Sequence, residues 1–197
     1  PRSAVVFVVE SLRLRRERGL PALTVISCDN LAGNGRLLAA AARRLAQQTD
    51  ASLAAWIECE VPFPCTMVDS ITPATTPELK ARVLAATGLE DAWPVQREAF
   101  VQWVLEQHEA TESPDWEAAG VIVTDDVAAY ECAKLRLLNG AHSTLAYAGL
   151  LRGHATVGEA MQDVALVEFV SRLLQEDVAP TLPRVRGFDV DDYVQKL

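Results

Sequence analysis

The stretch AYECAKLRLLNGAHSTLAYAG, residues 129–149, decides the fold of the second half of this chain, because it predicts a long, largely buried helix. At about 100° per residue, four of its polar side chains fall within an arc of about 140°. These side chains are Glu131, Lys134, Asn139 and His142. Three leucines share the arc, namely Leu135, Leu138 and Leu145. The face is therefore a polar patch in apolar surroundings, where ionisable groups are costly unless they have partners.

The same pattern also has a purely structural interpretation. A Glu and a Lys three residues apart on a helix are usually a surface ion pair, and an isolated Asn or His on an apolar helix is often a hydrogen-bonded core residue. Two features favour a functional site instead. The helix has little wholly polar face, and a second polar cluster, Cys28-Asp29-Asn30, follows an apolar run earlier in the chain. We therefore expect an active-site helix at residues 129–149.

The beginning of the chain predicts one half of an α/β unit. Residues 4–18 form an arginine-ended helix that stops at Gly19, and residues 23–27, LTVIS, have the composition of a buried parallel strand. Ligands of open α/β sheets bind beyond the carboxyl ends of strands, where Asn30 lies. The alternative is that Asp29 or Asn30 only caps the next helix, predicted at residues 36–48.

The middle of the chain predicts short strands and one further helix. From Val127 onward the pattern is helical, with a break at residues 153–158. Asp69 lies at the end of the first expected strand, within residues 67–73, and Thr156 is the expected cap of the last helix, which starts at residue 156. The expected elements are strands within residues 67–73, 99–107 and 121–127, a helix at 77–88 and one long helix at 156–178. We place the domain boundary between residues 1–124 and residues 125–197.

Composition narrows the classes of function. The 197 residues carry 18 Lys and Arg against 27 Asp and Glu, a formal charge of −9, which disfavours nucleic acid and anionic membranes as partners. The four cysteines have no CxxC spacing, so no metal site is expected. No signal-peptide pattern and no membrane span is apparent, and we expect a cytoplasmic protein. The sequence holds no GxGxxG or P-loop; the GNG at residues 33–35 is too short a signal.

Three stretches together resemble the polyol dehydrogenase family that includes mannitol 2-dehydrogenase, D-mannonate oxidoreductase and tagaturonate reductase. They are TVISCDNLAGNG at residues 24–35, FPCTMVDSITPAT at 63–75 and YECAKLRLLNGAHSTLAYAG at 130–149. The resemblance implies an α/β fold: part of a Rossmann-like nucleotide-binding domain followed by part of a mostly α-helical domain. It also implies that these residues belong to a considerably longer enzyme.

The resemblance also implies a role for each site residue. Lys134 resembles the general base, and Asn139 with Asn30 resembles the pair of amides that hold the developing alkoxide, Asn30 lying also on the cofactor side. His142 resembles a contact to a substrate hydroxyl and Glu131 a proton-relay carboxylate. Asp69 resembles a residue near the substrate pocket, although Ser70 stands where the family usually has Arg. Arg136 is a candidate cation for a substrate carboxylate.

The implied activity is NAD(P)-dependent oxidoreduction of a sugar acid or polyol to its keto form. D-Mannonate and D-fructuronate come first, and mannitol/fructose and tagaturonate are alternatives, as is an inactive binding module that keeps the fold. NAD is the expected cofactor, NADP is left open, and so is the oligomeric state. A lysine with a pKa of about 10.4 is a poor base at neutral pH, and burial in an apolar environment lowers such a pKa. We expect the helix around Lys134 to provide that burial.

Overall fold

The computed structural model describes residues 3–108, 113–183 and 188–196. The chain divides into two compact units, Pro1–Asp125 and Asp126–Leu197, each of which is described by itself. The first unit combines helices with a small sheet, and the described residues of the second are helices and their connections. This is the α/β organisation with a following helical part that the sequence predicts.

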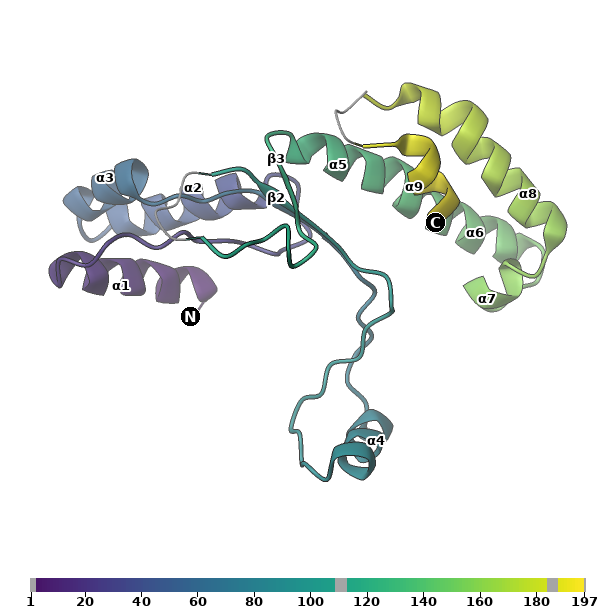
Figure 1. Cartoon of the computed structure of the whole chain (residues 1–197), viewed down its shortest axis with the longest axis horizontal. Helices are drawn as coiled ribbons and strands as arrows, with labels where there is room; N and C mark the ends of the chain where they lie inside the picture. The colour runs from purple at the N-terminus through teal and green to yellow at the C-terminus, as the bar shows by residue number, and fades with distance from the viewer. Residues whose placement is uncertain (1–2, 109–112, 184–187, 197) are drawn as a thin grey trace. The chain divides into compact units, whose positions relative to one another are not determined.

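Three helices of the first unit pack against one another, with α2 in contact with both α1 and α3 (Figure 1). They are α1 Ala4–Glu17, α2 Asn34–Gln47 and α3 Ala51–Glu60. The α3 helix begins where the carboxylate of Asp50 accepts hydrogen bonds from the backbone N–H groups of Ser52 and Leu53, as an N-cap does. Their shared core is aliphatic, and Leu12 and Ile57 lie at its centre, almost fully buried.

The sheet of the first unit has three strands in the order β1-β2-β3. They are β1 Thr66–Asp69, β2 Gln102–Glu106 and β3 Ile122–Thr124. The β1 strand runs antiparallel to β2, with Thr66 opposite Leu105, and β3 runs parallel to β2. Val104 and Leu105 of the central strand are wholly buried, so the sheet is held at its middle.

Residues 23–27 differ from the prediction, because they are not a strand of this sheet. The backbone N–H of Val25 donates to the carbonyl of Pro62 at 3.0 Å, so the segment runs beside residues 61–65. That neighbour is VPFPC, and neither Pro62 nor Pro64 has an N–H to donate. The apolar, β-branched composition of LTVIS is real, but the chain beside it cannot complete a ladder.

An excursion between β1 and β2 carries the helix α4 Pro77–Thr87, which lies where the sequence predicts a helix and stops at Gly88 as expected. Its N-cap is Thr76, whose side chain accepts from the Leu79 N–H. Gly88 has φ +72°, a left-handed conformation that favours glycine. The two sides of the excursion are joined at its base, where the Ser70 hydroxyl donates to the Phe100 carbonyl at 2.9 Å. The helix is thus presented on a closed loop and not on a free segment.

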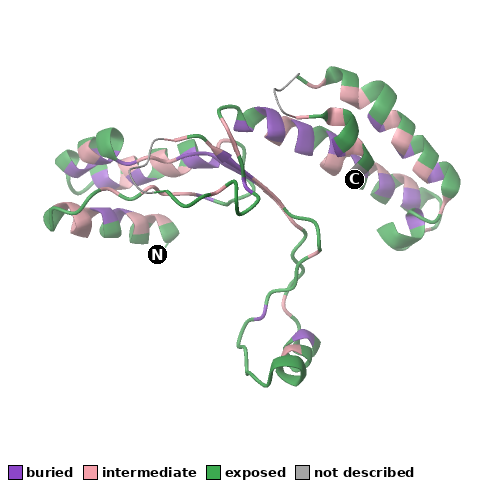
Figure 2. Cartoon of the chain, in the orientation of Figure 1, coloured by how far each residue is buried: buried purple, intermediate pink, exposed green. Residues whose placement is uncertain are grey.

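The second unit is a helical assembly with its own core (Figure 2). Its elements are α5 Val127–Ala133, the π-helical turn η1 Lys134–Asn139, α6 Gly140–Leu151, α7 Val157–Ala160, α8 Val164–Arg172, the π-helical turn η2 Leu173–Val178, the 3₁₀ turn η3 Ala179–Thr181 and α9 Val190–Lys196. Leu137 is fully buried in the core, with Leu145, Val170 and Leu174 around it. Phe188 joins α9 to this core, because its ring lies 5.0 Å from that of Tyr130 and 5.3 Å from that of Tyr193.

The single long helix predicted at residues 156–178 is broken in the structure. Thr156 caps α7, as expected, but this helix ends at Ala160 and α8 begins anew at Val164. Asp163 is the cause, because its carboxylate accepts from the backbone N–H of Leu166 and so caps α8. The same carboxylate accepts from Arg152 Nε at 2.5 Å and bonds His154 Nε2 at 3.1 Å. These bonds fix the break in place.

Candidate active site

The predicted active-site helix is one continuous helical segment that contains an irregular turn. It begins at Asp126, whose carboxylate accepts from the Ala129 N–H at 3.1 Å, and it continues through α5, η1 and α6 to Leu151. The residues at both joints, Ala133 and Gly140, keep right-handed helical dihedrals. The π-helical turn is therefore an internal widening of the helix, of the kind often found at functional sites.

Lys134 and Asn139 are the first and last residues of this π-helical turn. They are five residues apart, which in an α-helix would place them on opposite edges of the predicted polar arc. A π-helical turn closes its hydrogen bonds between residues i and i+5 and holds more residues than an α-helical turn. The irregularity therefore brings the amine and the carboxamide closer to one face than the sequence pattern predicts.

Burial separates the four polar residues of this helix. Lys134 is only 7 % exposed, while Glu131 and Asn139 are half-buried and His142 is exposed. The burial that the sequence predicts for Lys134 is thus present. The series runs from a buried amine to an accessible imidazole, which suits a site whose reacting group is kept from bulk water.

Arg136 lies within the same turn, and its side chain is exposed. Its Nη1 donates to the carbonyl oxygen and to the hydroxyl oxygen of Thr181, each at 3.1 Å. Arg136 is the residue that the sequence suggests as the cation for a substrate carboxylate. In the second unit its guanidinium instead contacts Thr181.

The first unit carries Asn30 on a turn that is firmly attached to β1. The buried side chain of Asn34 makes the attachment: its Nδ2 donates to the Asp29 carbonyl at 2.9 Å and to the Thr66 carbonyl at 3.0 Å, and its Oδ1 accepts from the Thr66 N–H at 2.9 Å. The Thr66 hydroxyl donates to the Ser27 carbonyl at 2.6 Å. Asn30 itself is exposed, so its carboxamide is presented on a rigid support.

Gly35 allows the start of α2 to lie very close to the backbone of Phe63 and Pro64. A Cβ atom at this position would lie 2.4 Å from the Phe63 carbonyl oxygen and 2.5 Å from the Pro64 carbonyl oxygen. Neither contact could be relieved by moving a side chain, since both contacting oxygens belong to the backbone. Asn34 and Gly35 are thus the support of the site. Sequence reasoning missed them, and the short GNG motif was their only visible signal.

Three more residues of the first unit bear on the site. Asp69 is the last residue of β1, at the predicted strand end, and it is half-buried. Ser70 follows it, and its hydroxyl is used at the base of the α4 excursion. Partial desolvation raises the pKa of the Cys28 thiol, although the residue as a whole is exposed. Asn30 and Asp69 therefore belong to one unit, and the lysine helix belongs to the other.

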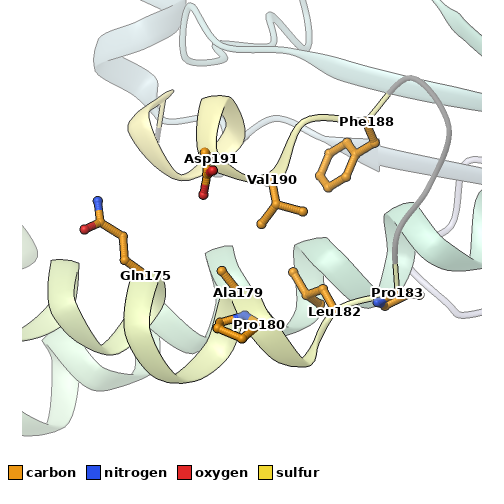
Figure 3. Close-up of a pocket in the computed structure, with 8 residues that line it drawn as sticks. All are labelled: Gln175, Ala179, Pro180, Leu182, Pro183, Phe188, Val190 and Asp191. Carbon is orange, nitrogen blue, oxygen red and sulfur yellow. The ribbon is translucent and has the colours of Figure 1, made fainter.

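A pocket of about 530 Å³ lies in the second unit between α9 and the η2–η3 segment (Figure 3). In the part of the lining that the structure describes, Phe188 and Val190 on one side face Ala179, Pro180 and Leu182 on the other, and Gln175 and Asp191 add polar groups. None of the predicted site residues lines this pocket. Within the described ranges no three His, Cys, Asp or Glu side chains are grouped as metal ligands. In the same residues no helix has the length and apolar character needed to cross a membrane.

Comparisons with known proteins agree with these features. The D-mannonate oxidoreductase of Escherichia coli (strain K12) is 44 % identical over 197 residues, which is 100 % of this chain and 40 % of that protein. The substrate-free crystal structure of a D-sorbitol dehydrogenase superposes with a TM-score of 0.91 at 40 % identity. The ternary complex of Pseudomonas fluorescens mannitol 2-dehydrogenase with NAD and D-mannitol superposes with a TM-score of 0.80 at 43 % identity. Both structures are matched over 100 % of this chain and 40 % of their own, so the chain spans well under half of these relatives.

Two family profiles also match, one on each side of the boundary between the units. Residues 1–118 match the mannitol dehydrogenase Rossmann domain, and residues 126–197 match the mannitol dehydrogenase C-terminal domain. Together the two matches cover nearly the whole chain. The chain belongs to the mannitol dehydrogenase family.

Proposed function

We propose that this sequence supplies the lysine helix and part of the nucleotide-binding domain of an NAD-dependent sugar-acid dehydrogenase that interconverts D-mannonate and D-fructuronate. One observation carries the proposal: Lys134 is more than nine-tenths buried at the start of a π-helical turn that ends at Asn139. A buried amine, with a carboxamide carried at the other end of the same turn, suits removal of a proton from a secondary alcohol.

The residues divide the chemistry between them. Lys134 takes the hydroxyl proton as the alcohol becomes a carbonyl, and Asn139 donates a hydrogen bond to the oxygen on which negative charge develops. Asn30, on its turn in the first unit, is the second amide donor. Glu131 passes the proton from Lys134 toward solvent, and the exposed His142 orients a further hydroxyl of the substrate.

The cofactor supplies the acceptor for the hydride when it is bound. The residues present suit its nicotinamide end, because Asn30 presents a carboxamide on a turn that Asn34 holds to β1. The ternary complex of the related mannitol 2-dehydrogenase contains NAD, which supports the choice of cofactor. NADP is tested beside NAD in the assay described below.

Two findings support the choice of substrate. The relative named D-mannonate oxidoreductase is 44 % identical to this chain, and the motif KLRLLNGAHS at residues 134–143 resembles the uronate and aldonate reductases of the family. The second candidate is mannitol oxidation, favoured by the 43 % identity to a mannitol 2-dehydrogenase solved with D-mannitol. Altronate, the product of tagaturonate reduction, is the third substrate to be assayed.

The test uses an enzyme of the relatives' full length that contains this sequence. Its kcat/KM is measured for mannonate, mannitol and altronate, each with NAD and with NADP, and we expect mannonate with NAD to be highest. Lys134→Ala should lower kcat by about 10²–10⁴-fold, the contribution typical of a general base, with an unchanged circular dichroism spectrum. Added methylamine should restore part of the rate by replacing the missing amine.

Lys80→Ala is the matched control, since Lys80 is exposed and stacks over Trp93, 5.2 Å from the ring centroid, on the α4 excursion. Its kcat should remain at the wild-type level. Near-normal turnover of Lys134→Ala at neutral pH would remove Lys134 from the chemistry. Activity with none of the three substrates would instead favour the alternative of a binding module that keeps the fold.

A further inference from the structure

We propose that Arg136 and Thr181 form a clamp that positions the catalytic face, holding the π-helical turn so that Lys134 and Asn139 stay on one side of the helix. The inference rests on the proposed function and adds positioning residues to it. In this role Arg136 acts through Lys134 and Asn139 and does not itself touch the substrate.

The clamp is built from one guanidinium nitrogen and both oxygens of one residue. Arg136 Nη1 lies 3.1 Å from the Thr181 carbonyl oxygen and 3.1 Å from the Thr181 hydroxyl oxygen. That hydroxyl in turn donates to the Val178 carbonyl at 2.8 Å. The guanidinium is therefore tied to the end of the η2–η3 segment, 45 residues further along the chain.

A second contact beside the clamp fixes the same turn from the inside. Leu137 is fully buried, and the turn that carries it, η1, packs against η2 in the same core as Leu174. An apolar anchor and a hydrogen-bonded anchor on neighbouring residues constrain both the depth and the rotation of η1.

The turn needs this support because a π-helical turn is a rare and locally unfavourable geometry. Both of its ends keep ordinary helical dihedrals, so an α-helical arrangement of the same residues is close by. In that arrangement Lys134 and Asn139 would be turned away from each other, toward the two edges of the polar arc. A misplacement of about 1 Å in a catalytic pair can cost about 100-fold in rate.

The competing role for Arg136 is that of the cation for a substrate carboxylate. The geometry favours the clamp, because Nη1 is already engaged by two neutral oxygens within the protein. The two roles differ in their need for Thr181, because only the clamp requires this residue. They also predict different effects on substrates: a carboxylate-binding arginine matters only for an acidic substrate, whereas the clamp matters equally for a neutral one.

The experiment compares Arg136→Gln, Thr181→Val and Thr181→Ser in the full-length enzyme, with Arg172→Gln as the matched control. Arg172 is an exposed arginine whose Nε and Nη2 donate to Glu176 at 3.0 and 3.1 Å, in the neighbouring helical segment. The readouts are kcat and KM for mannonate and for mannitol, KM for NAD, and hydrogen exchange of the peptide spanning residues 131–142.

We expect Arg136→Gln and Thr181→Val each to lower kcat by about 10- to 100-fold with both substrates. KM for NAD should change less than twofold, exchange in residues 131–142 should accelerate, and Thr181→Ser should restore both properties. Arg172→Gln should match wild type in every readout.

A rise in KM for mannonate but not for mannitol in Arg136→Gln, with Thr181→Val behaving as wild type, would overturn the clamp in favour of a carboxylate-binding arginine. Unchanged exchange in both clamp variants would overturn it as well. The exchange measurement does not depend on activity. An enzyme inactive with every substrate would therefore refute the proposed function and still leave the clamp to be decided.

Discussion

Asn34 and Thr66, 32 residues apart in sequence, are joined by three hydrogen bonds: the Asn34 amide donates to the carbonyl and hydroxyl of Thr66 and accepts from its backbone N–H. The Asn34 side chain is almost fully buried, and its oxygen also accepts from the Gly35 N–H at 2.7 Å. This one carboxamide connects the turn that carries Asn30, the start of α2 and the start of β1.

Replacing Asn34 should therefore destabilise the first unit. Asn34→Ala leaves the N–H groups of Thr66 and Gly35 buried without their acceptor, at a cost of about 1–3 kcal/mol for each group. We expect the free energy of unfolding, measured by urea denaturation, to fall by about 2–4 kcal/mol. Gln47→Ala, an exposed amide at the end of the same helix, should change it by less than about 0.5 kcal/mol. Equal effects of the two substitutions would show that the Asn34 network contributes little.

Gly35→Ala and Gly140→Ala form a pair with opposite expected signs. At Gly35 the new methyl group would meet two backbone carbonyls at 2.4 and 2.5 Å, and the strain should lower the unfolding free energy by about 1–3 kcal/mol. At Gly140, a helical position, no atom outside the adjoining helix backbone lies within 4 Å of the added carbon. Alanine there should raise stability by about 0.4–1 kcal/mol. Thermal melts of both variants check the signs, and a stable Gly35→Ala protein would mean that residues 63–64 can move away.

The Asp163 carboxylate should make the stability of the second unit depend on acid pH. Hydrogen bonds from Arg152 and then His154 lower the pKa of Asp163 from 3.8 to about 2. A carboxyl pKa that is lower in the folded state contributes stability at pH values above 3.8, and this contribution is lost as the pH falls toward 2. Asp163→Asn should therefore lower the melting temperature at pH 6 and bring it close to wild type at pH 2. Asp177→Asn, at an exposed position, serves as the control, and a constant difference between Asp163→Asn and wild type across this range would contradict the linkage.

Asn139 should contribute to the rate and not to the binding of cofactor. In the full-length enzyme, Asn139→Ala removes one donor to the developing alkoxide, which in comparable sites costs about 10²–10³ in kcat. We expect this loss in steady-state oxidation of mannonate with KM for NAD unchanged. Ser143→Ala, at an exposed position four residues further along the helix, is the control. A loss confined to KM would instead make Asn139 a ground-state binding residue.

The helices were predictable where local signals decide them. Thr76 and Pro77 begin α4 and Gly88 ends it through its left-handed backbone, so cap chemistry alone sets its limits. Residues 23–27 were predicted wrongly, because a β-branched run indicates an extended chain but says nothing about its neighbour. Here the neighbour contains Pro62 and Pro64, which cannot donate.

The site was only partly predictable for a similar reason. Apolar periodicity at the α-helical angle placed Lys134 and Asn139 on one broad arc and correctly indicated that the lysine is buried. It could not reveal the π-helical turn, because i to i+5 pairing has no periodic signature within six residues. Asp163 likewise looked like one polar residue on a long helix, and only its bonds to Arg152 and His154 show that it interrupts the helix.

The widened turn at Lys134–Asn139 also changes how substitutions along this helix should be compared. Residues before Lys134 and after Asn139 do not follow a single uninterrupted α-helical count, so a stripe drawn at constant spacing from Glu131 to Leu145 mixes two registers. Deleting one residue between them would keep the composition almost unchanged and yet rotate everything downstream. For this helix, the number of residues is as much a part of the site as their identity.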